Sequence, residues 1–282
     1  MMMRHKLLYL SFLLLLIGVG RAAAQSSWAG GDLRNFTYEP SCASEDSAKP
    51  VTVKDGEYSY EKQEDGYIDH FYFKVFDVIY GDLTGDGKAE AVALTVCNTG
   101  GTGNFTEGFI FGVQNGRTVQ LAILPGGDRA YGGIRKVWIE TGRLVVETND
   151  PGELGGACCP TEIITSTYKL AGKTLNEVVA STKRAIYPSR RVAFAKGKSE
   201  AVIKLTVRGD EGAELVVRAN KGQTMTVTTD NKSVETNFDS ESKMTSLDNG
   251  FRAVLADSGD QKIRLDNQLS SVVTVTIKIT VN

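Results

Sequence analysis

Along most of the chain, apolar residues come in short runs that alternate with polar residues and are separated by Gly, Asn and Asp. The last run alternates most regularly and places Val273, Val275, Ile277, Ile279 and Val281 two residues apart. Because residues two apart share one face of a strand, this run predicts a strand with one side facing a core. Beyond the N-terminal segment, no helical periodicity extends over more than a couple of turns. We therefore expect an all-β protein.

The other apolar runs are rich in Val, Ile, Thr and aromatic residues, which favour strands. The first half contains FYFKVFDVIY, EAVALTV, GFIFGV, TVQLAIL, IRKVWIE, RLVVET and EIITSTYKL. The second half contains AVIKLTV, AELVVRA, TMTVTT, FRAVLA, QKIRLD and VVTVTIKITV. Asn115-Gly116 predicts a tight hairpin, and Lys221-Gly222 and Asn249-Gly250 also lie where turns are expected. This spacing predicts antiparallel sheets in the first half and a β-sandwich in the second.

Residues 1–24 have the order of parts found in a signal peptide. Arg4, His5 and Lys6 are the basic residues, Leu7 to Val19 form the apolar run, and 22–24 are alanines. We expect cleavage before Gln25, rather than a buried helix or an anchor, and a periplasmic or secreted protein. No Cys follows the apolar run to indicate a lipid anchor. No other run of about 18 apolar residues predicts a membrane span after cleavage.

The remaining chain divides near residue 188, at the charged segment STKRAIYPSRR. Residues 25–187 contain all four Cys and both Trp and have a net charge of -7, whereas residues 188–282 have a net charge of +2. We predict a disulfide-containing β domain over 25–187 and a β-sandwich over 188–282. The charge difference is compatible with an interface of opposite signs between them.

Composition excludes several classes of function. After cleavage His70 is the only histidine, so one chain cannot build a two-histidine zinc site. Any nucleophile paired with histidine would need His70, which lies in an alternating apolar run typical of a strand. No motif selects a pair of catalytic carboxylates, so we expect no enzyme. A net charge of -2 argues against a nucleic-acid partner.

The cysteines are an even set in an exported chain, which predicts disulfides. They are Cys42, Cys97, Cys158 and Cys159. A bond between the neighbours Cys158 and Cys159 is disfavoured by the usual Cα separation in disulfides. We therefore expect each of these two to pair with Cys42 or Cys97, in an order that the sequence leaves open. A metal site or a redox pair is the alternative, but no C-x-x-C spacing supports it.

The segment GDLTGDGKAEA, residues 81–91, is the sharpest local motif. It spaces oxygen ligands as a calcium loop does, with Gly87 at the sharp turn. The expected ligands are Asp82, Thr84, Asp86, the carbonyl of Lys88, and Glu90. Ala93 stands where an EF-hand has its bidentate Glu, and the flanking runs are strands. The loop resembles the Asp-rich loop of FG-GAP and VCBS-type bacterial repeats, which lies between strands. The alternative is an Asp-Gly turn whose carboxylates accept backbone N–H groups; no other cofactor is expected.

Two further loops have simpler interpretations. The Gly-rich segment CNTGGTGNF lacks the Gly-Lys-Ser/Thr ending of a phosphate loop, so Gly100, Gly101 and Gly103 predict a loop with positive φ. Asp128 and Arg129 predict a local turn with an ion pair. With GACCP, these motifs resemble an exported bacterial domain of unassigned function, over residues 68–175.

The second half contains a more extensive pattern, over residues 191–265. It consists of Phe194-Ala-Lys-Gly, Arg218-Ala-Asn-Lys-Gly-Gln-Thr-Met-Thr-Val, Ser258-Gly-Asp and Ile263-Arg-Leu. This pattern resembles the bacterial inhibitors of g-type lysozyme. The resemblance implies a compact β-sandwich that blocks the cleft of a lysozyme with surface loops. Gln261 departs from the family, which has an aromatic residue there.

Two expectations follow for the second half. Gly222 makes a turn, with Met225 and Val227 facing the core. Loops near Asp230–Lys232 and Ser240–Gly250 contact the partner, because they are polar and lie between strands. The resemblance implies an exported, non-catalytic binding protein whose partner is g-type lysozyme. The alternative is a calcium-stabilised envelope or secreted module that binds another extracellular protein or a glycan.

Overall fold

The computed structural model describes residues 27–43, 50–64, 66–153, 155–238 and 240–282. The predicted signal peptide, 1–24, and its cleavage point before Gln25 lie outside these residues. Across the described ranges the regular structure is entirely β, as expected from the sequence. This part of the chain also contains no helix with the length and apolar character of a membrane span.

The first large sheet has five antiparallel strands in the order β3-β4-β5-β6-β7. Its strands are β3 (Glu57–Glu64), β4 (Tyr67–Gly81), β5 (Glu90–Asn98), β6 (Phe105–Gln114) and β7 (Arg117–Leu124). A short pair, β1 (Thr37–Tyr38) and β2 (Val51–Thr52), precedes it. Asn115 and Gly116 have φ values of 51° and 73° at the β6–β7 hairpin, as two central residues of a type I′ turn require. The predicted hairpin is confirmed.

The central strand β5 is buried on both faces. Its alternate residues Ala91 and Ala93 belong to a core with the N-terminal segment, which contributes buried Leu33 and Tyr38. The residues between them point to the opposite face, where a second core lies. The sheet is therefore the middle layer of the first half, with different partners on its two sides.

The second sheet covers that opposite face. Its antiparallel order is β11-β10-β9-β8, and its strands are β8 (Ile134–Glu140), β9 (Arg143–Asp150), β10 (Glu162–Ala171) and β11 (Thr174–Ala185). Leu144 and Val146 of β9 pack in one cluster with Val92 and Leu94 of β5. The two sheets thus share a single apolar layer.

The second half contains two further sheets. One has the order β12-β14-β19-β16, with β12 (Ser189–Arg191), β14 (Gly212–Ala219), β19 (Gly259–Asn267) and β16 (Val234–Asn237). The other has the order β13-β20-β15-β18-β17, with β13 (Glu200–Val207), β20 (Val273–Val281), β15 (Thr224–Thr229), β18 (Gly250–Val254) and β17 (Lys243–Leu247). Side chains from both sheets form one buried cluster, which makes this half a β-sandwich.

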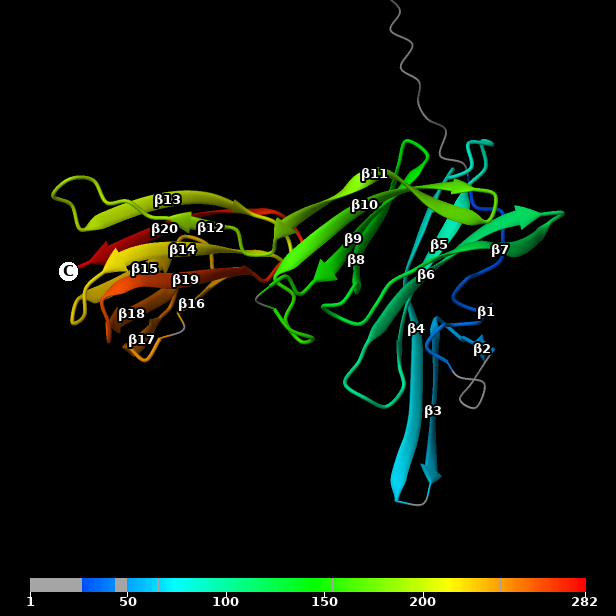
Figure 1. Cartoon of the computed structure of the whole chain (residues 1–282), viewed down its shortest axis with the longest axis horizontal. Helices are drawn as coiled ribbons and strands as arrows, with labels where there is room; N and C mark the ends of the chain where they lie inside the picture. Colours follow the sequence, from blue (N-terminus) through cyan, green and yellow to red (C-terminus); the bar gives the residue numbers. More distant parts are fainter. Residues whose placement is uncertain (1–26, 44–49, 65, 154, 239) are drawn as a thin grey trace, which may run out of the picture.

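Strand β20 has the face that its alternation predicts. Val275, Ile277 and Ile279 are fully buried, and Val273 and Val281 at its ends are almost so. Intervening residues point to solvent or are half-buried. Figure 1 shows β12 to β20 at one end of an elongated molecule, β8 to β11 in the middle, and the sheet of β3 to β7 at the other end.

Candidate functional site

The Asp-rich loop connects β4 and β5 and is held by its own carboxylates. Asp82 accepts a hydrogen bond on each oxygen, at 2.6 Å from Gly85 N and 2.9 Å from Gly87 N. Asp86 Oδ1 accepts one from Lys88 N at 2.9 Å. Gly85 and Gly87 have φ values of 81° and 83°, which glycine adopts without steric cost. The spacing of the motif therefore serves a tightly wound turn.

Glu90 closes the same loop from the first residue of β5. Its Oε2 accepts hydrogen bonds from Leu83 N at 2.8 Å and Thr84 N at 3.0 Å, and its Oε1 accepts one from Thr84 Oγ1 at 3.3 Å. Burial raises the pKa of the Glu90 carboxyl above its ordinary value, although the two backbone donors oppose this effect. Glu90 thus joins both ends of the loop.

These contacts bear on the expected calcium site. Within the ranges that the structure covers, no three His, Cys, Asp or Glu side chains are grouped so that they could hold a metal ion. The oxygens of Asp82 and Glu90 are directed at backbone donors, so ligation would require some of these hydrogen bonds to be exchanged for a cation. The turn interpretation accounts for the geometry as folded, and calcium binding stays a prediction.

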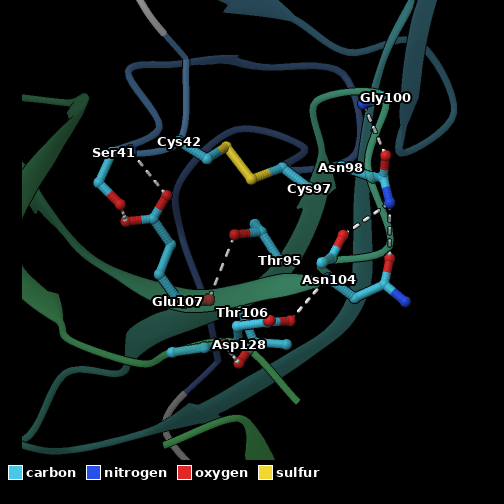
Figure 2. The surroundings of a disulfide bond; sticks show 12 residues. Ser41, Cys42, Thr95, Cys97, Asn98, Gly100, Asn104, Thr106, Glu107 and Asp128 are labelled. Atoms are coloured by element: carbon cyan, nitrogen blue, oxygen red, sulfur yellow. Dashed lines mark hydrogen bonds between the residues drawn. A yellow bond between two sulfur atoms is a disulfide. The ribbon is translucent and has the colours of Figure 1, made fainter. Parts of the chain in front are cut away.

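The first disulfide fastens the N-terminal segment to the central strand. Cys42 is bonded to Cys97 of β5, with a Cα–Cα separation of 6.6 Å. Beside it, buried Glu107 of β6 accepts hydrogen bonds from Ser41 N and Ser41 Oγ, each at 2.9 Å. Figure 2 shows the disulfide and the Ser41–Glu107 pair side by side, with Thr95 donating to the Glu107 carbonyl. The segment is therefore held both covalently and by a carboxylate.

The Gly-rich loop after β5 is held by amide side chains. Asn98 Nδ2 donates to the carbonyls of Gly101 and Gly103, and Asn98 Oδ1 accepts a hydrogen bond from Gly100 N (Figure 2). Positive φ was expected at three glycines, and the structure has it at Gly100, with 92°, but not at Gly101 or Gly103, where the expectation was wrong. A Cβ at Gly100 would lie 3.3 Å from His70 Cδ2. The loop is a self-contained turn packed against His70.

The predicted turn at Asp128 and Arg129 is present. Arg129 Nε lies 3.2 Å from Asp128 Oδ1. The same carboxylate oxygen accepts a hydrogen bond from Asn104 N at 2.7 Å, which joins this turn to the Gly-rich loop (Figure 2). The ion pair expected from the sequence is confirmed.

The expected disulfide pairing was wrong. The structure joins Cys158 to Cys159, with a Cα–Cα separation of 3.8 Å, and neither reaches Cys42 or Cys97. The reason is topological, because Cys97 faces the N-terminal segment while Cys158 and Cys159 lie in the loop between β9 and β10, in the other sheet. Chain connectivity brings the two neighbours together despite the unusual separation.

In the second half, residues 219–225 form a turn that is held by hydrogen bonds. Gly222 has a φ of 81°, and its N–H donates to the Leu255 carbonyl at 2.8 Å. Lys221 N donates to Ser258 Oγ at 2.9 Å. Met225 and Val227 of β15 are fully buried. The predicted turn and its two core residues are confirmed.

The two loop regions predicted to contact a partner are not one surface. The region Ser240–Gly250 contains the exposed edge strand β17, so the expectation of a continuous loop was wrong. The strand forms because residues 243–247 pair antiparallel with β18. The Asn249 turn lies beside residues 229–231, where Asn249 Nδ2 donates to the Thr229 carbonyl at 2.7 Å. Ser242 instead lies at the opposite end of the sandwich, where its Oγ accepts from Ala256 N at 3.0 Å.

The end of the sandwich that carries Thr229 and Asn249 faces the first half. Asp210, in the β13–β14 loop at this end, accepts a hydrogen bond on its carbonyl from Arg135 Nη2 of β8 at 3.0 Å. The opposite end carries the 220–223 turn, Ser240–Ser242 and residues 255–258. We call these three segments the free-end loops. Figure 1 shows that the free end points away from β8 to β11.

A cluster of charges, in which half-buried Arg184 meets two buried glutamates, joins the two halves, and the sequence analysis did not single it out. Arg184 of β11 binds both oxygens of Glu211 at 2.7 and 2.9 Å, and binds Glu147 of β9 at 2.8 Å. Burial lowers the pKa of Arg184, but the two carboxylates outweigh burial and raise it. The sequence signal for this cluster was the basic segment at the domain boundary, which separates two halves of opposite net charge.

An open groove of about 810 Å³ lies between the two halves. One wall comes from the β9–β10 loop and β11, and the other from β14, β19 and Tyr187. Lys183 on the first wall pairs with Asp150 at 3.3 Å and Glu162 at 2.8 Å. On the second wall, the Arg264 guanidinium lies 3.9 Å from the ring centroid of Tyr187. Lys183 and Arg264, one on each wall, therefore already have partners within the protein.

Three solved structures similar to this chain are periplasmic lysozyme inhibitors of g-type lysozyme. Aeromonas hydrophila PliG is 21% identical, with 34% of this chain and 97% of that chain covered and a TM-score of 0.31. A mutant of Escherichia coli PliG is 18% identical, covers 34% and 99%, and has a TM-score of 0.30. Salmonella Typhimurium PliG is 15% identical, covers 34% and 98%, and has a TM-score of 0.28.

No protein-family model and no curated protein sequence matches the chain significantly.

Proposed function

We propose that this protein is an exported, non-catalytic binding protein that inhibits a g-type lysozyme through residues 188–282. The observation that carries the proposal is the family-like pattern over residues 191–265, which forms a sandwich with its own buried core. Its most specific segment, Ala219–Met225, is a structured turn at the free end. The apolar run and basic residues of 1–24 support a periplasmic or secreted location.

We place the inhibitory surface on the free-end loops. The other end of the sandwich contacts the first half through Asp210 and Glu211, which leaves less room there for a large partner. Exposed Lys221 stands at the tip of the 220–223 turn, and its backbone is fixed to Ser258. A preorganised loop loses little conformational freedom on binding, which favours affinity.

The test uses the mature full chain, from Gln25, in an assay of peptidoglycan lysis by a g-type lysozyme. We expect excess protein to suppress lysis, and Lys221→Glu to weaken the inhibition by at least about tenfold, or about 1.4 kcal/mol. Lys232→Glu is the matched control, because Lys232 is also exposed but lies at the end facing the first half. Undiminished lysis by folded protein would refute the function, and equal loss in both variants would refute only the surface.

A calcium-stabilised module that binds another extracellular protein or a glycan is a second candidate. A groove of about 640 Å³ borders the Asp-rich loop and is lined in part by Asp86, Lys88 and Glu90. Binding of a ligand in this groove would require the Asp-rich loop to keep its folded conformation. Binding of a glycan or protein that is abolished by a chelator would favour this function, whereas inhibition of lysozyme that persists with the chelator would favour the first.

A further inference from the structure

The two disulfides of this protein differ in how a reductant can reach them. Cys97 is 2% exposed in the core between the first sheet and the N-terminal segment, and its partner Cys42 is half-buried against that core. Cys158 and Cys159 are both exposed at the tip of the β9–β10 loop. Exchange begins with a thiolate attacking a disulfide sulfur, so access to the sulfur controls its rate. The exposed pair is therefore the more accessible of the two to exchange in the folded protein.

The two bonds also differ in what they hold together. Cys42 and Cys97 are separated by 55 residues, whereas Cys158 and Cys159 are adjacent. A disulfide stabilises a fold mainly by restricting the unfolded chain, and this effect grows with the length of the closed loop. Opening the bond between neighbours should therefore leave the global fold intact and release only the local turn.

That turn is compact and held by backbone contacts. Cys159 N donates to the Gly156 carbonyl at 2.9 Å, and Gly156 N donates to the Cys159 carbonyl at 3.3 Å. Further in, the Pro151 carbonyl accepts hydrogen bonds from Gly155 N at 2.8 Å and Thr161 Oγ1 at 2.7 Å. The disulfide joins the side chains of Cys158 and Cys159 on the solvent-exposed side of this turn.

The same loop forms one wall of the groove between the two halves. Gly152, Glu153 and Thr161 line the groove directly. Asp150 and Glu162, at the two ends of the loop, are the ion-pair partners of Lys183. The turn and this charged groove wall therefore belong to the same loop.

We propose that Cys158 and Cys159 form a thiol–disulfide exchange site whose redox state sets the order of the β9–β10 loop and hence of the groove wall. The co-reactant is a dithiol, either a small molecule or the active-site pair of a protein oxidoreductase. One thiolate attacks a sulfur of the pair and forms a mixed disulfide, which releases the other cysteine as a thiolate. The second thiol of the reductant then attacks the mixed disulfide. The two cysteines gain two electrons and two protons, and the dithiol becomes a disulfide.

The first experiment measures which bond opens first. The folded full chain is titrated with dithiothreitol, free thiols are alkylated, and the protein is then digested with trypsin. The relevant peptides are 35–54, 89–117 and 144–169, and they report separately on Cys42, on Cys97 and on the adjacent pair. We expect half-reduction of Cys158–Cys159 at a concentration at least about tenfold lower than that for Cys42–Cys97. Concurrent reduction of both bonds would overturn the proposal.

The second experiment measures the consequence by hydrogen exchange of the backbone amides, at the concentration that opens only the adjacent pair. We expect faster exchange over residues 150–162, with the strands of the sandwich unchanged. The double variant Cys158→Ser, Cys159→Ser should exchange like the reduced wild type and should not respond to the reductant in this range. Unchanged exchange over 150–162 after selective reduction would overturn the link between the bond and the loop.

Discussion

The two halves of the molecule use different means to make β structure stable. In the sandwich, β20 buries every second residue, and no disulfide is present in the described part of this half. In the first half, β5 is buried on both faces between two unlike layers, and a disulfide and buried Glu107 fasten one of those layers. Regular alternation suffices where two sheets face each other, whereas an irregular N-terminal segment needs specific anchors to cover a sheet.

The largest expected effect comes from a cavity in the irregular core. Phe109 of β6 is fully buried and contacts Tyr38 of the N-terminal segment at a ring-centroid distance of 5.1 Å. Phe109→Ala should destabilise the first half by about 3–5 kcal/mol. Hydrogen exchange measured separately for the two halves checks this. Equal destabilisation of β14 and β20 would show that the halves unfold as one unit.

The covalent anchor should have the next largest effect. Replacing Cys42 and Cys97 together with Ala should cost the first half about 2–4 kcal/mol, because the unfolded chain gains freedom. Denaturant unfolding followed by the fluorescence of Trp28 and Trp138, which both lie in the first half, measures the loss. The paired control is Cys158→Ala, Cys159→Ala, for which a much smaller loss is expected. Equal losses would contradict the difference drawn between the two disulfides.

Added calcium should show whether a bound metal ion also stabilises the first half. If the Asp-rich loop binds Ca²⁺, a 100-fold excess over the dissociation constant should add about 2.7 kcal/mol to the stability of the first half. Thermal melting should then rise with calcium in the wild type but not in Asp86→Asn, which keeps an acceptor for Lys88 N while removing the charge. Asp77→Asn is the control, because Asp77 is exposed and makes a similar local bond to Val78 N. Identical melting temperatures with calcium and with a chelator would show that the Asp-rich loop binds no calcium.

The contact between the halves should contribute less. Arg184→Met leaves Glu147 and Glu211 without their cation, and we expect a loss of about 1–3 kcal/mol, since Arg184 is partly exposed. The domain orientation should also loosen, which small-angle scattering would detect as a broader range of molecular dimensions. Lys183→Met should have a smaller effect, because its ion pairs are exposed. An unchanged scattering profile for Arg184→Met would mean that the cluster does not fix the orientation.

The sequence was informative where a local rule decides the structure. Alternation identified the buried face of β20, Asn115-Gly116 identified a hairpin, and Gly222 with Met225 identified a turn entering the core. Each of these outcomes depends on residues close together in the chain. The all-β class follows from the same rules.

Prediction failed where partners distant in sequence decide the structure. The pairing of Cys42 with Cys97 depends on which face of the first sheet the N-terminal segment covers, and no local pattern encodes that. Strand β17 lies in a segment that the sequence predicts as loop, since residues 243–247 are mostly polar, and pairing with β18 makes them a strand. The Arg184 cluster draws its three members from β9, β11 and the β13–β14 loop. Only the overall charge difference between the halves pointed toward it.

The position of β20 has a consequence for biosynthesis. The last strand of the chain lies inside its sheet, paired with β13 on one side and β15 on the other. In a chain synthesised from its N-terminus, β13 has no partner in that sheet until residues 273–281 have emerged, and the core of the sandwich stays open until then. The strands of the first half are complete earlier, so that half can fold first. Pairing of β20 therefore closes the sandwich, and removal of this strand would leave one folded half and one exposed, aggregation-prone half.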